Sequence, residues 1–318
     1  MTGHGGPGAG VGGPVTRPNA PEPPAEPALD VLLEAAPVRA GARGGRPPGP
    51  IARRYGGPLA IPLRPHRPTV IANFVESLDG IVALATGPRG GGSDISGSSE
   101  ADRFVMALLR TVADVVVVGA GTVRAAPRHE WTPAGISPAW APACEEWRAS
   151  MRLAPQPTTV VVTSAGDVDP GHPGLSAPGV PVVIATTVAG ARALTARGIP
   201  PGARVEVLVE EGPLTGTALR GLLSRLHVRL ALCEGGPHLL ADLLADDALD
   251  ELFLTLAPQI LGRASAFTRL GLAEGHAWEP GSAHWARLGS VRRGDSHLFL
   301  RYSLRRGSGD GHGRPPSR

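Results

Sequence analysis

Short apolar runs alternate with amphipathic segments through most of the chain. Several runs contain almost no polar residues, which is typical of strands buried on both faces of a parallel sheet. Strands are predicted at residues 69–74, 114–118, 158–163, 181–185, 205–209, 228–233 and 251–257. Helices are predicted at residues 99–112, 188–197, 215–226 and 237–245. This alternation predicts an α/β fold in which helices cover both sides of a mostly parallel sheet.

Two stretches depart from this alternation. Residues 284–304 form two apolar segments around Gly294-Asp295, a pair typical of a tight turn, which predicts an antiparallel C-terminal hairpin at the edge of the sheet. Residues 127–157 are rich in Pro and Trp and are expected to form a surface insertion. Ser99 precedes Asp102 by three residues, as in a capping box, and predicts the start of the helix over 99–112.

The two ends of the chain have a different composition. Residues 1–54 are dominated by Gly, Pro and Ala and are predicted to be a disordered tail, because they bury too little apolar area to offset the entropy of ordering. Within this tail, the apolar stretch 28–37 is expected to form a helical turn or two. Residues 306–318 are predicted to be a second disordered tail, which leaves one folded domain over residues 55–305.

Composition excludes some classes of protein. The 318 residues include 44 Gly and 34 Pro but no lysine. A P-loop needs a lysine beside its phosphates and a pyridoxal enzyme needs a Schiff-base lysine, so both classes are excluded. The net charge of +3 does not indicate a nucleic-acid partner, because many arginines lie in the low-complexity ends rather than in a folded basic stripe.

Cysteine and apolar content bear on the location of the protein. Cys144 and Cys233 are too few for a disulfide framework or a four-cysteine zinc site, and no metal site is expected. The sequence shows no apolar segment long enough to cross a bilayer and no hydrophobic leader, so no membrane partner is expected. These features predict a cytoplasmic protein.

Two of the predicted strands end in glycine-rich turns. The run of valines at 115–118 leads into Gly119-Ala120-Gly121-Thr122, and the run at 228–233 leads into Glu234-Gly235-Gly236-Pro237. Ligands of open α/β sheets bind beyond the carboxyl ends of the strands, where glycines admit a ligand to the main chain and helix N-termini attract anions. The alternative for each loop is a tight strand-to-helix turn. Two such loops in one domain favour a ligand site.

The residues around these turns favour NADP over NAD. The dinucleotide pattern GxGxxG requires a glycine where the chain has Arg124, and the next strand ends in Thr163-Ser164 rather than in the acid that binds an NAD ribose. Arg124 suits a 2′-phosphate, or is alternatively a surface arginine. The first strand of the sheet ends in Ser77-Leu78-Asp79-Gly80, which places Asp79 at the same carboxyl edge.

Three motifs in this order resemble a known family. SLDG at 77–80, ADVVVVGAGTV at 113–123 and CEGGPHLLADLL at 233–244 are similar to the reductase domain of the bifunctional riboflavin biosynthesis deaminase–reductase. The resemblance covers residues 67–303 and implies a dihydrofolate-reductase-like three-layer fold. It also implies NADPH-dependent reduction of a ribosylaminopyrimidine, with hydride added to the imine carbon of the ring-opened sugar. Members are often homodimers, and the apolar hairpin is a candidate interface.

The resemblance also implies roles for individual residues. Glu234 and Asp79 are the expected catalytic residues facing the substrate, with Glu234 or a water as proton donor; Glu234 alternatively caps a helix. The expected substrate-binding residues are Ser77, Arg110 and Arg128. The expected cofactor-binding residues are Gly119, Gly121, Thr122, Val123, Arg124, Thr163, Ser164, Gly235, Gly236 and Pro237.

The chain departs from the family pattern after GTV. Ala126 stands where an acid is usual, Ile81 replaces a lysine, and Arg128 is the candidate substitute for a substrate arginine that has no clear match. The zinc motifs of the deaminase half are absent from the sequence, and His129-Glu130 is expected to lie in an exposed loop. Two alternatives therefore stay open: a dihydrofolate or pterin reductase on the same fold, and a non-catalytic NADP-binding protein.

Overall fold

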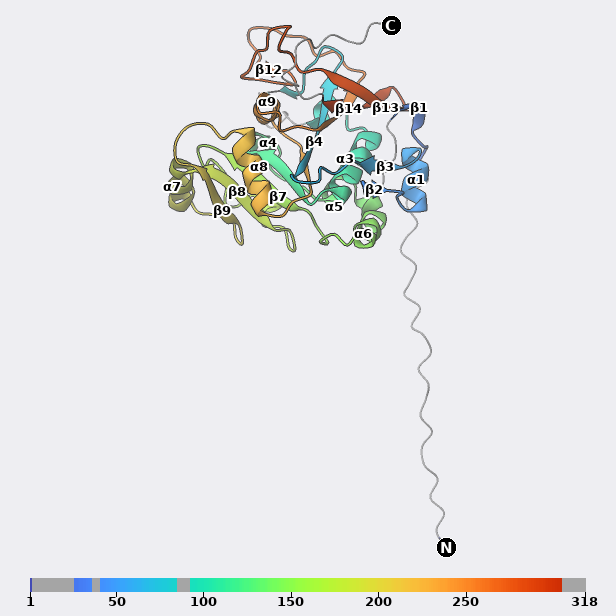
Figure 1. The fold of residues 1–318 in the computed structure, drawn as a ribbon, viewed down its shortest axis with the longest axis horizontal. Coiled ribbons are helices and arrows are strands. Elements are labelled where there is room, and N and C mark those ends of the chain that lie inside the picture. The colour runs from blue at the N-terminus through green and yellow to red at the C-terminus, as the bar shows by residue number, and fades with distance from the viewer. Residues whose placement is uncertain (2–25, 36–40, 85–91, 305–318) are drawn as a thin grey trace.

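The computed structural model describes Met1 and residues 26–35, 41–84 and 92–304. One large sheet runs through it (Figure 1), with the strands in the order β1-β13-β14-β11-β4-β10-β6-β7-β8-β9. These strands are β1 (Asp30–Glu34), β13 (Ala286–Gly294), β14 (His297–Leu304), β11 (Glu251–Ala257), β4 (Thr69–Ser77), β10 (Leu230–Cys233), β6 (Val115–Gly119), β7 (Thr158–Thr163), β8 (Val182–Thr187) and β9 (Arg204–Val209).

Strand directions match the predicted pattern. From β11 to β9 every neighbouring pair is parallel. Strands β14, β13 and β1 add antiparallel pairs at one edge. The hairpin turn lies at Gly294, which pairs with His297, and Asp295 adopts a φ of 51° there. The α/β prediction with a mostly parallel sheet and an antiparallel terminal hairpin is confirmed.

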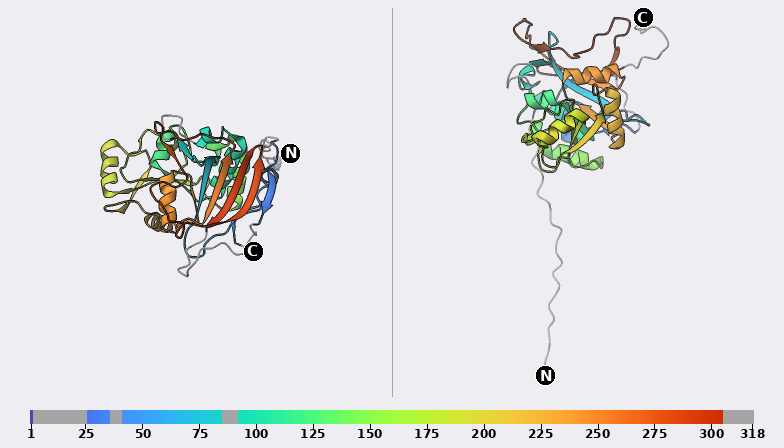
Figure 2. Two further views of the ribbon diagram at one scale, coloured as in Figure 1. Left: turned by 90° about the horizontal axis from the view of Figure 1, so that it is seen from above. Right: turned by 90° about the vertical axis from the view of Figure 1, so that its left-hand side faces the viewer.

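Helices cover both faces of the sheet (Figures 1 and 2). One face carries α1 (Gly49–Tyr55), α3 (Glu100–Val112), α5 (Pro133–Ile136), α6 (Ala141–Ser150) and α7 (Val188–Arg197). The other face carries α8 (Gly216–Arg225) and α9 (Pro237–Ala245). The remaining elements are α2 (Gly92–Ile95), α4 (Ala120–Ala125), η1 (Pro138–Trp140), η2 (Pro173–Leu175) and the small sheets β2 (Arg43–Gly45) with β3 (Leu59–Ile61) and β5 (Ala83–Leu84) with β12 (Arg269–Leu270).

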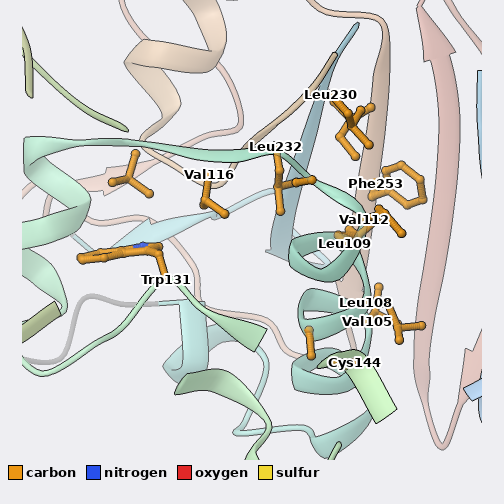
Figure 3. Packing of buried hydrophobic residues seen from close by; sticks show 14 of the residues in the cluster. Val105, Leu108, Leu109, Val112, Val116, Trp131, Cys144, Leu230, Leu232 and Phe253 are labelled. Carbon is orange, nitrogen blue, oxygen red and sulfur yellow. The ribbon is translucent and has the colours of Figure 1, made fainter. Parts of the chain in front are cut away.

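The valines of β6 show why its sequence is apolar without interruption. Side chains alternate along a strand, so Val116 and Val118 join the core beneath α3, whereas Val115 and Val117 join the core beneath α8 and α9. Figure 3 shows the first of these cores, in which Val112 of α3 packs in one cluster with residues of β10 and β11. Burial on both faces leaves β6 in the middle of the sheet, and its carboxyl end opens at the sheet edge.

The prediction that residues 127–157 form a surface insertion is wrong. Trp131, Trp140 and Trp147 are each no more than 2% exposed, and they pack against α3 through α5, η1 and α6. An indole buries a large apolar area, so three of them favour docking over exposure. Arg148 of α6 also enters the interior, where its Nη1 donates to the carbonyls of Arg110, Thr111 and Ala113 and satisfies the C-terminal end of α3.

The predicted boundary at residue 55 is also wrong. The described part of the stretch 28–37, residues 28–35, contains no helical turn: Asp30–Glu34 is strand β1, which pairs with β13. Glu34 there accepts a hydrogen bond from the buried guanidinium of Arg292 at 2.7 Å, and that guanidinium lies over the ring of Tyr55. Residues 41–54 of the predicted tail contain β2 and most of α1, whereas residues 2–25, 36–40 and 306–318 lie outside the described residues. Among the helices that the structure describes, none has the length and apolar character needed to span a membrane.

Candidate functional site

The two glycine-ended loops lie side by side at the carboxyl edge of the sheet. Strands β6 and β10 are parallel neighbours, so their ends meet there. The N–H of Glu234 donates to the carbonyl of Val117 at 2.9 Å, and the N–H of Gly119 donates to the carbonyl of Gly235 at 3.1 Å. The N–H of Gly236 donates to Thr122 Oγ1 at 3.0 Å. The predicted convergence of residues 119–122 and 234–237 is therefore confirmed.

Contact between the loops requires a glycine at position 235. A Cβ atom added to Gly235 overlaps Thr122 Oγ1 and lies 2.8 Å from Thr122 Cγ2. A Cβ atom added to Gly119 comes no nearer than 3.6 Å to the carbonyl oxygen of Gly235, an ordinary contact. The packing of the two loops therefore requires glycine at position 235 but not at position 119.

Helix α9 begins at this junction with unsatisfied N–H groups. Helices α3, α5, α7 and α8 are capped by the side chains of Ser99, Thr132, Thr187 and Thr215. Within the described residues, α9 begins without a side-chain cap, as do α4 at the same edge and α1 and α6 elsewhere. Pro237 has no N–H, so the N–H groups of His238 and Leu239 in the first turn of α9 are the ones left for an anion.

The expected cofactor-binding residues divide into an exposed and a buried set. Gly121, Arg124 and Ser164 are exposed on the rim of the edge. Val123 and Thr163 are buried, with exposed fractions of 1% and 6%, so their side chains are not available to a ligand. This corrects the expectation for the side chains of Val123 and Thr163, because alternate positions of these elements face the core.

Arg124 lies in a small charged group on the rim. Its Nη1 is 3.1 Å from Asp167 Oδ2, and Arg197 Nη1 is 3.0 Å from Asp167 Oδ1. All three side chains are more than half exposed. One carboxylate thus balances two guanidinium groups, which leaves a net positive charge beyond the end of β7.

Glu234 is buried in an ion pair with Arg110 of α3. Arg110 donates from Nε to Glu234 Oε1 at 2.8 Å and from Nη2 to Glu234 Oε2 at 2.6 Å. The two side chains are 0% and 3% exposed. Both carboxylate oxygens of Glu234 accept from one guanidinium, and a bidentate pair of this kind fixes the position of the carboxylate.

Arg110 has no donor to spare for a substrate. Its remaining N–H groups bind the carbonyls of Glu130 and Thr132 and the Nε2 atom of His129. A guanidinium has five N–H groups, and all five are therefore engaged within the protein. The expectation that Arg110 binds substrate is wrong for this conformation; the residue instead positions Glu234 and the segment 129–132.

His129 belongs to this network and not to an exposed loop. Because Arg110 donates to His129 Nε2 at 2.7 Å, the imidazole is neutral with its proton on Nδ1. Burial, together with the nearby charge of Arg110, lowers the pKa of His129 to about 3. His129 and His172 both pack against Trp131, which fixes the segment beside the site. Sequence reasoning missed this role, although His129 and Trp131 are separated by a single residue.

The SLDG turn is held to a distant segment by Asp79. The carboxylate accepts from the N–H groups of Leu261 and Gly262 at 3.1 and 2.7 Å and from Ser77 Oγ at 2.7 Å. The hydrogen bond from Ser77, followed by those from the main chain, lowers the pKa of Asp79 to about 2.

The strand register separates Asp79 from Glu234. Cys233 pairs with Ala72, and Ser77 lies five residues further along β4, about 16 Å at 3.3 Å per residue. The structure therefore does not bring Asp79 beside Glu234. Arg128 is exposed on the loop after α4.

A separate cavity of about 440 Å³ opens at the other edge of the sheet. It is lined by the amino ends of β6 to β9 and by Leu226–Val228. It lies a full strand length away from the glycine loops and does not belong to the candidate site.

Comparison with known proteins places the chain in a family. A family model described as the RibD C-terminal domain matches residues 68–290, more than half of the chain. A search of curated proteins finds no match.

Solved structures share the fold. A pyrimidine reductase-like protein from Corynebacterium diphtheriae is 21% identical, with a TM-score of 0.57, and the match covers 75% of this chain and 92% of that one. A deaminase/5-amino-6-(5-phosphoribosylamino)uracil reductase from Thermotoga maritima is 18% identical, with a TM-score of 0.55, over 74% of this chain and 56% of that one. The riboflavin biosynthesis reductase Rib7 from Saccharomyces cerevisiae is 16% identical, with a TM-score of 0.50, over 76% and 92%. The predicted three-layer fold is confirmed, and the chain belongs to the RibD C-terminal domain family.

Proposed function

We propose that this protein is an NADPH-dependent reductase of a ribosylaminopyrimidine. The observation that carries the proposal is the meeting of the 119–122 and 234–237 loops at one sheet edge, in a member of the RibD C-terminal domain family. Solved structures with this fold include a uracil reductase and a riboflavin biosynthesis reductase. The alternating strands and helices, and the N–H groups at the start of α9 beside the second loop, agree with a dinucleotide as ligand.

The residues at the edge fit a phosphorylated dinucleotide. Gly121 is exposed, and the N–H groups of His238 and Leu239 in the first turn of α9 are directed to the same junction. The N–H of Gly236 is engaged by Thr122 Oγ1, and the hydroxyl hydrogen of Thr122 is left to donate to a phosphate. When bound, NADPH supplies the hydride. Gly119, Gly235 and Pro237 complete the proposed main-chain cradle.

We place the substrate in a proposed opening between Glu234 and Asp79. Strand β10 ends opposite Ala72, so the β4 segment 73–77 continues past it and borders this opening. Glu234, held in place by Arg110, accepts hydrogen bonds from the amino or amide N–H groups of a pyrimidine. Asp79 lies at the far border, and the predicted substrate residue Ser77, which is 0% exposed, supports it by donating to its carboxylate. The exposed Arg128 is the proposed contact for the substrate phosphate. Orientation of the two reactants is the main contribution of the protein.

NADPH oxidation with separate acceptors tests this function. We expect turnover with 5-amino-6-(5-phosphoribosylamino)uracil and none with dihydrofolate. Turnover with dihydrofolate alone would favour a pterin reductase. Saturable NADPH binding without turnover of either acceptor would favour a non-catalytic NADP-binding protein, and failure to bind NADPH would refute all three.

Arg124 is proposed to select NADPH through its 2′-phosphate. Replacing Arg124 by Gln is expected to raise the dissociation constant for NADPH about tenfold, about 1.4 kcal/mol, while leaving that for NADH unchanged. The substitution removes the exposed guanidinium, which a 2′-phosphate would bind in place of Asp167 and which NADH does not contact. Fluorescence titration with both nucleotides measures the ratio, and Arg192→Gln on the exposed side of α7 is the matched control. Equal losses for NADPH and NADH would contradict the assignment.

We also propose that the protein is a homodimer that uses the hairpin edge of the sheet. No helix of the described chain lies over the outer face of β11, β14, β13 and β1 (Figure 2, left). That face carries half-buried apolar side chains, namely Leu252, Leu256, Val291, Leu298, Leu300 and Tyr302, and the exposed Leu33. An apolar patch on this scale marks an interaction surface.

Replacing Leu300 by Glu at the centre of this face is expected to convert a dimer into a monomer of 32.6 kDa. A buried unpaired carboxylate in the interface makes association unfavourable. Sedimentation equilibrium at micromolar concentration measures the mass, with Val207→Glu on the exposed β9 edge as control. A wild-type protein that sediments as a monomer would remove the proposal.

A further inference from the structure

Among the buried carboxylates of the described residues, that of Asp102 lacks the arginine partner that the others have. Glu234 pairs with Arg110, Glu251 with Arg301, and Asp250 with Arg64 and Arg67. Asp102 of α3 is 4% exposed, yet among the described side chains no arginine is within ion-pair distance of it. Burial of a carboxylate without a cation is costly, so such a group is a candidate for function.

Local structure does not explain the position of the Asp102 side chain. Its main-chain N–H donates to Ser99 Oγ at 3.3 Å, which confirms Ser99 as the cap of α3. In a full capping box the side chain of Asp102 would turn back to the start of the helix. The side chains of Thr255 of β11 and of Ser96 lie within hydrogen-bonding reach of its carboxyl instead. The carboxyl therefore reaches across from the helix to the sheet.

Asp102 lies on the face of the sheet that borders the proposed substrate opening. Phe253 of β11 belongs to the core beneath α3, so Thr255, two residues further on, points to the same face. Thr255 pairs with Val75, within the β4 segment that continues past the end of β10. Asn73 of this segment is buried on the same face. Asp102, Thr255 and Asn73 thus form a polar layer at the edge of an otherwise apolar core.

The surroundings of Asp102 favour its neutral form. Burial raises the pKa of its carboxyl, and the nearby negative charge of Glu234 acts in the same direction. Thr255, His297 and Ser96 act in the opposite direction. His297 of β14 is held by its Nε2 atom on the Ser96 carbonyl at 3.0 Å. His297 and Glu234 are the titratable groups that face Asp102 from the packed elements.

We propose that Asp102 is the proton donor of the reduction, at the end of the opening where Glu234 binds the substrate. This inference rests on the proposed function. The O–H bond of Asp102 breaks and an N–H bond forms at the imine nitrogen, while hydride from the dihydronicotinamide forms the C–H bond at the sugar carbon. One hydride and one proton thereby saturate the C=N bond, the nucleotide leaves oxidised, and the Asp102 carboxylate is reprotonated from solvent. Glu234, locked by Arg110, only binds and orients.

The test compares Asp102→Asn with wild type and with Glu100→Gln, an exposed acid on the same turn of α3. Loss of a general acid is expected to lower kcat by about 10²- to 10⁴-fold and to remove the alkaline limb of the pH profile, while the dissociation constant for NADPH stays within about threefold. Glu100→Gln should leave kcat unchanged. Near-wild-type kcat in Asp102→Asn, with its pH profile intact, would overturn the proposal.

A second measurement needs neither substrate nor turnover. The infrared difference spectrum between wild type and Asp102→Asn at neutral pH should contain the band of a protonated carboxyl group. A carboxylate band alone would overturn the proposal even if the enzyme is active. If wild type oxidises no NADPH while the protonated band is present, the proposed function fails, and this assignment of the proton donor fails with it. A folded, inactive Asp102→Asn beside an active wild type supports the assignment.

Discussion

Replacing Gly235 by Ala is expected to weaken NADPH binding by at least about 100-fold, about 2.7 kcal/mol. The added methyl group would lie 2.8 Å from Thr122 Cγ2 and 3.0 Å from its Cβ, and these atoms belong to a short, partly buried side chain on the neighbouring loop. The 119–122 and 234–237 loops must then separate, and the N–H groups at the start of α9 no longer face the same point as Gly121. Isothermal titration with NADPH measures the loss.

Gly221→Ala is the matched control for this substitution. Gly221 lies within α8, where a Cβ atom meets nothing nearer than 3.8 Å, so the same chemical change should leave NADPH binding unaltered. Overpacking costs about 1–3 kcal/mol of stability, so thermal melting must show that Gly235→Ala is folded at the titration temperature. Binding of NADPH by folded Gly235→Ala at the wild-type affinity would show that the loops do not form the cradle.

Replacing Arg110 by Met is expected to lower the free energy of unfolding by about 3–5 kcal/mol. The substitution leaves Glu234 as a buried, unpaired carboxylate and removes the donors to the carbonyls of Glu130 and Thr132. The segment 129–132 then loses its anchor on α3. Urea unfolding monitored by tryptophan fluorescence gives the free energy, and Trp131 reports on the segment.

A double variant separates charge from packing. In Arg110→Met with Glu234→Leu, two apolar side chains replace the buried ion pair, so much of the lost stability should return. Substrate turnover should not return, because the carboxylate that orients the substrate is gone. A loss below about 1 kcal/mol in Arg110→Met would contradict the assignment of this pair as the main link between α3 and the site.

The sheet was predictable because its central strands are buried on both faces. Val115–Val118 and the runs that become β4, β7, β8, β10 and β11 carry apolar residues without regular interruption, a pattern that few other structures produce. Parallel direction then places the glycine turns at one edge, so the meeting of Thr122 with Gly235 follows from order and direction alone. The hairpin at Gly294-Asp295 was predictable from its turn residues.

Features that depend on partners far along the chain were not predictable. Strand β1 sits in a sequence rich in Gly and Pro and forms because β13, more than 250 residues later, offers a free edge. The family resemblance marks Arg110 as a substrate residue, and only the approach of Glu234 and His129 shows that its donors are used up. Asp102 reads as a cap residue, and its contact with Thr255 depends on how α3 crosses the sheet.

Titration of NADPH into 15N-labelled protein shows whether both loops hold one nucleotide. We expect saturable shifts of the amide signals of Gly121, Thr122, His238 and Leu239, two from each loop region. The Arg124 signal should shift with NADPH but not with NADH. It predicts no shifts at Val115 or His227, which line the cavity at the opposite edge of the sheet. Saturable shifts confined to that cavity, or to one of the two loops, would contradict the claim that both loops hold one nucleotide.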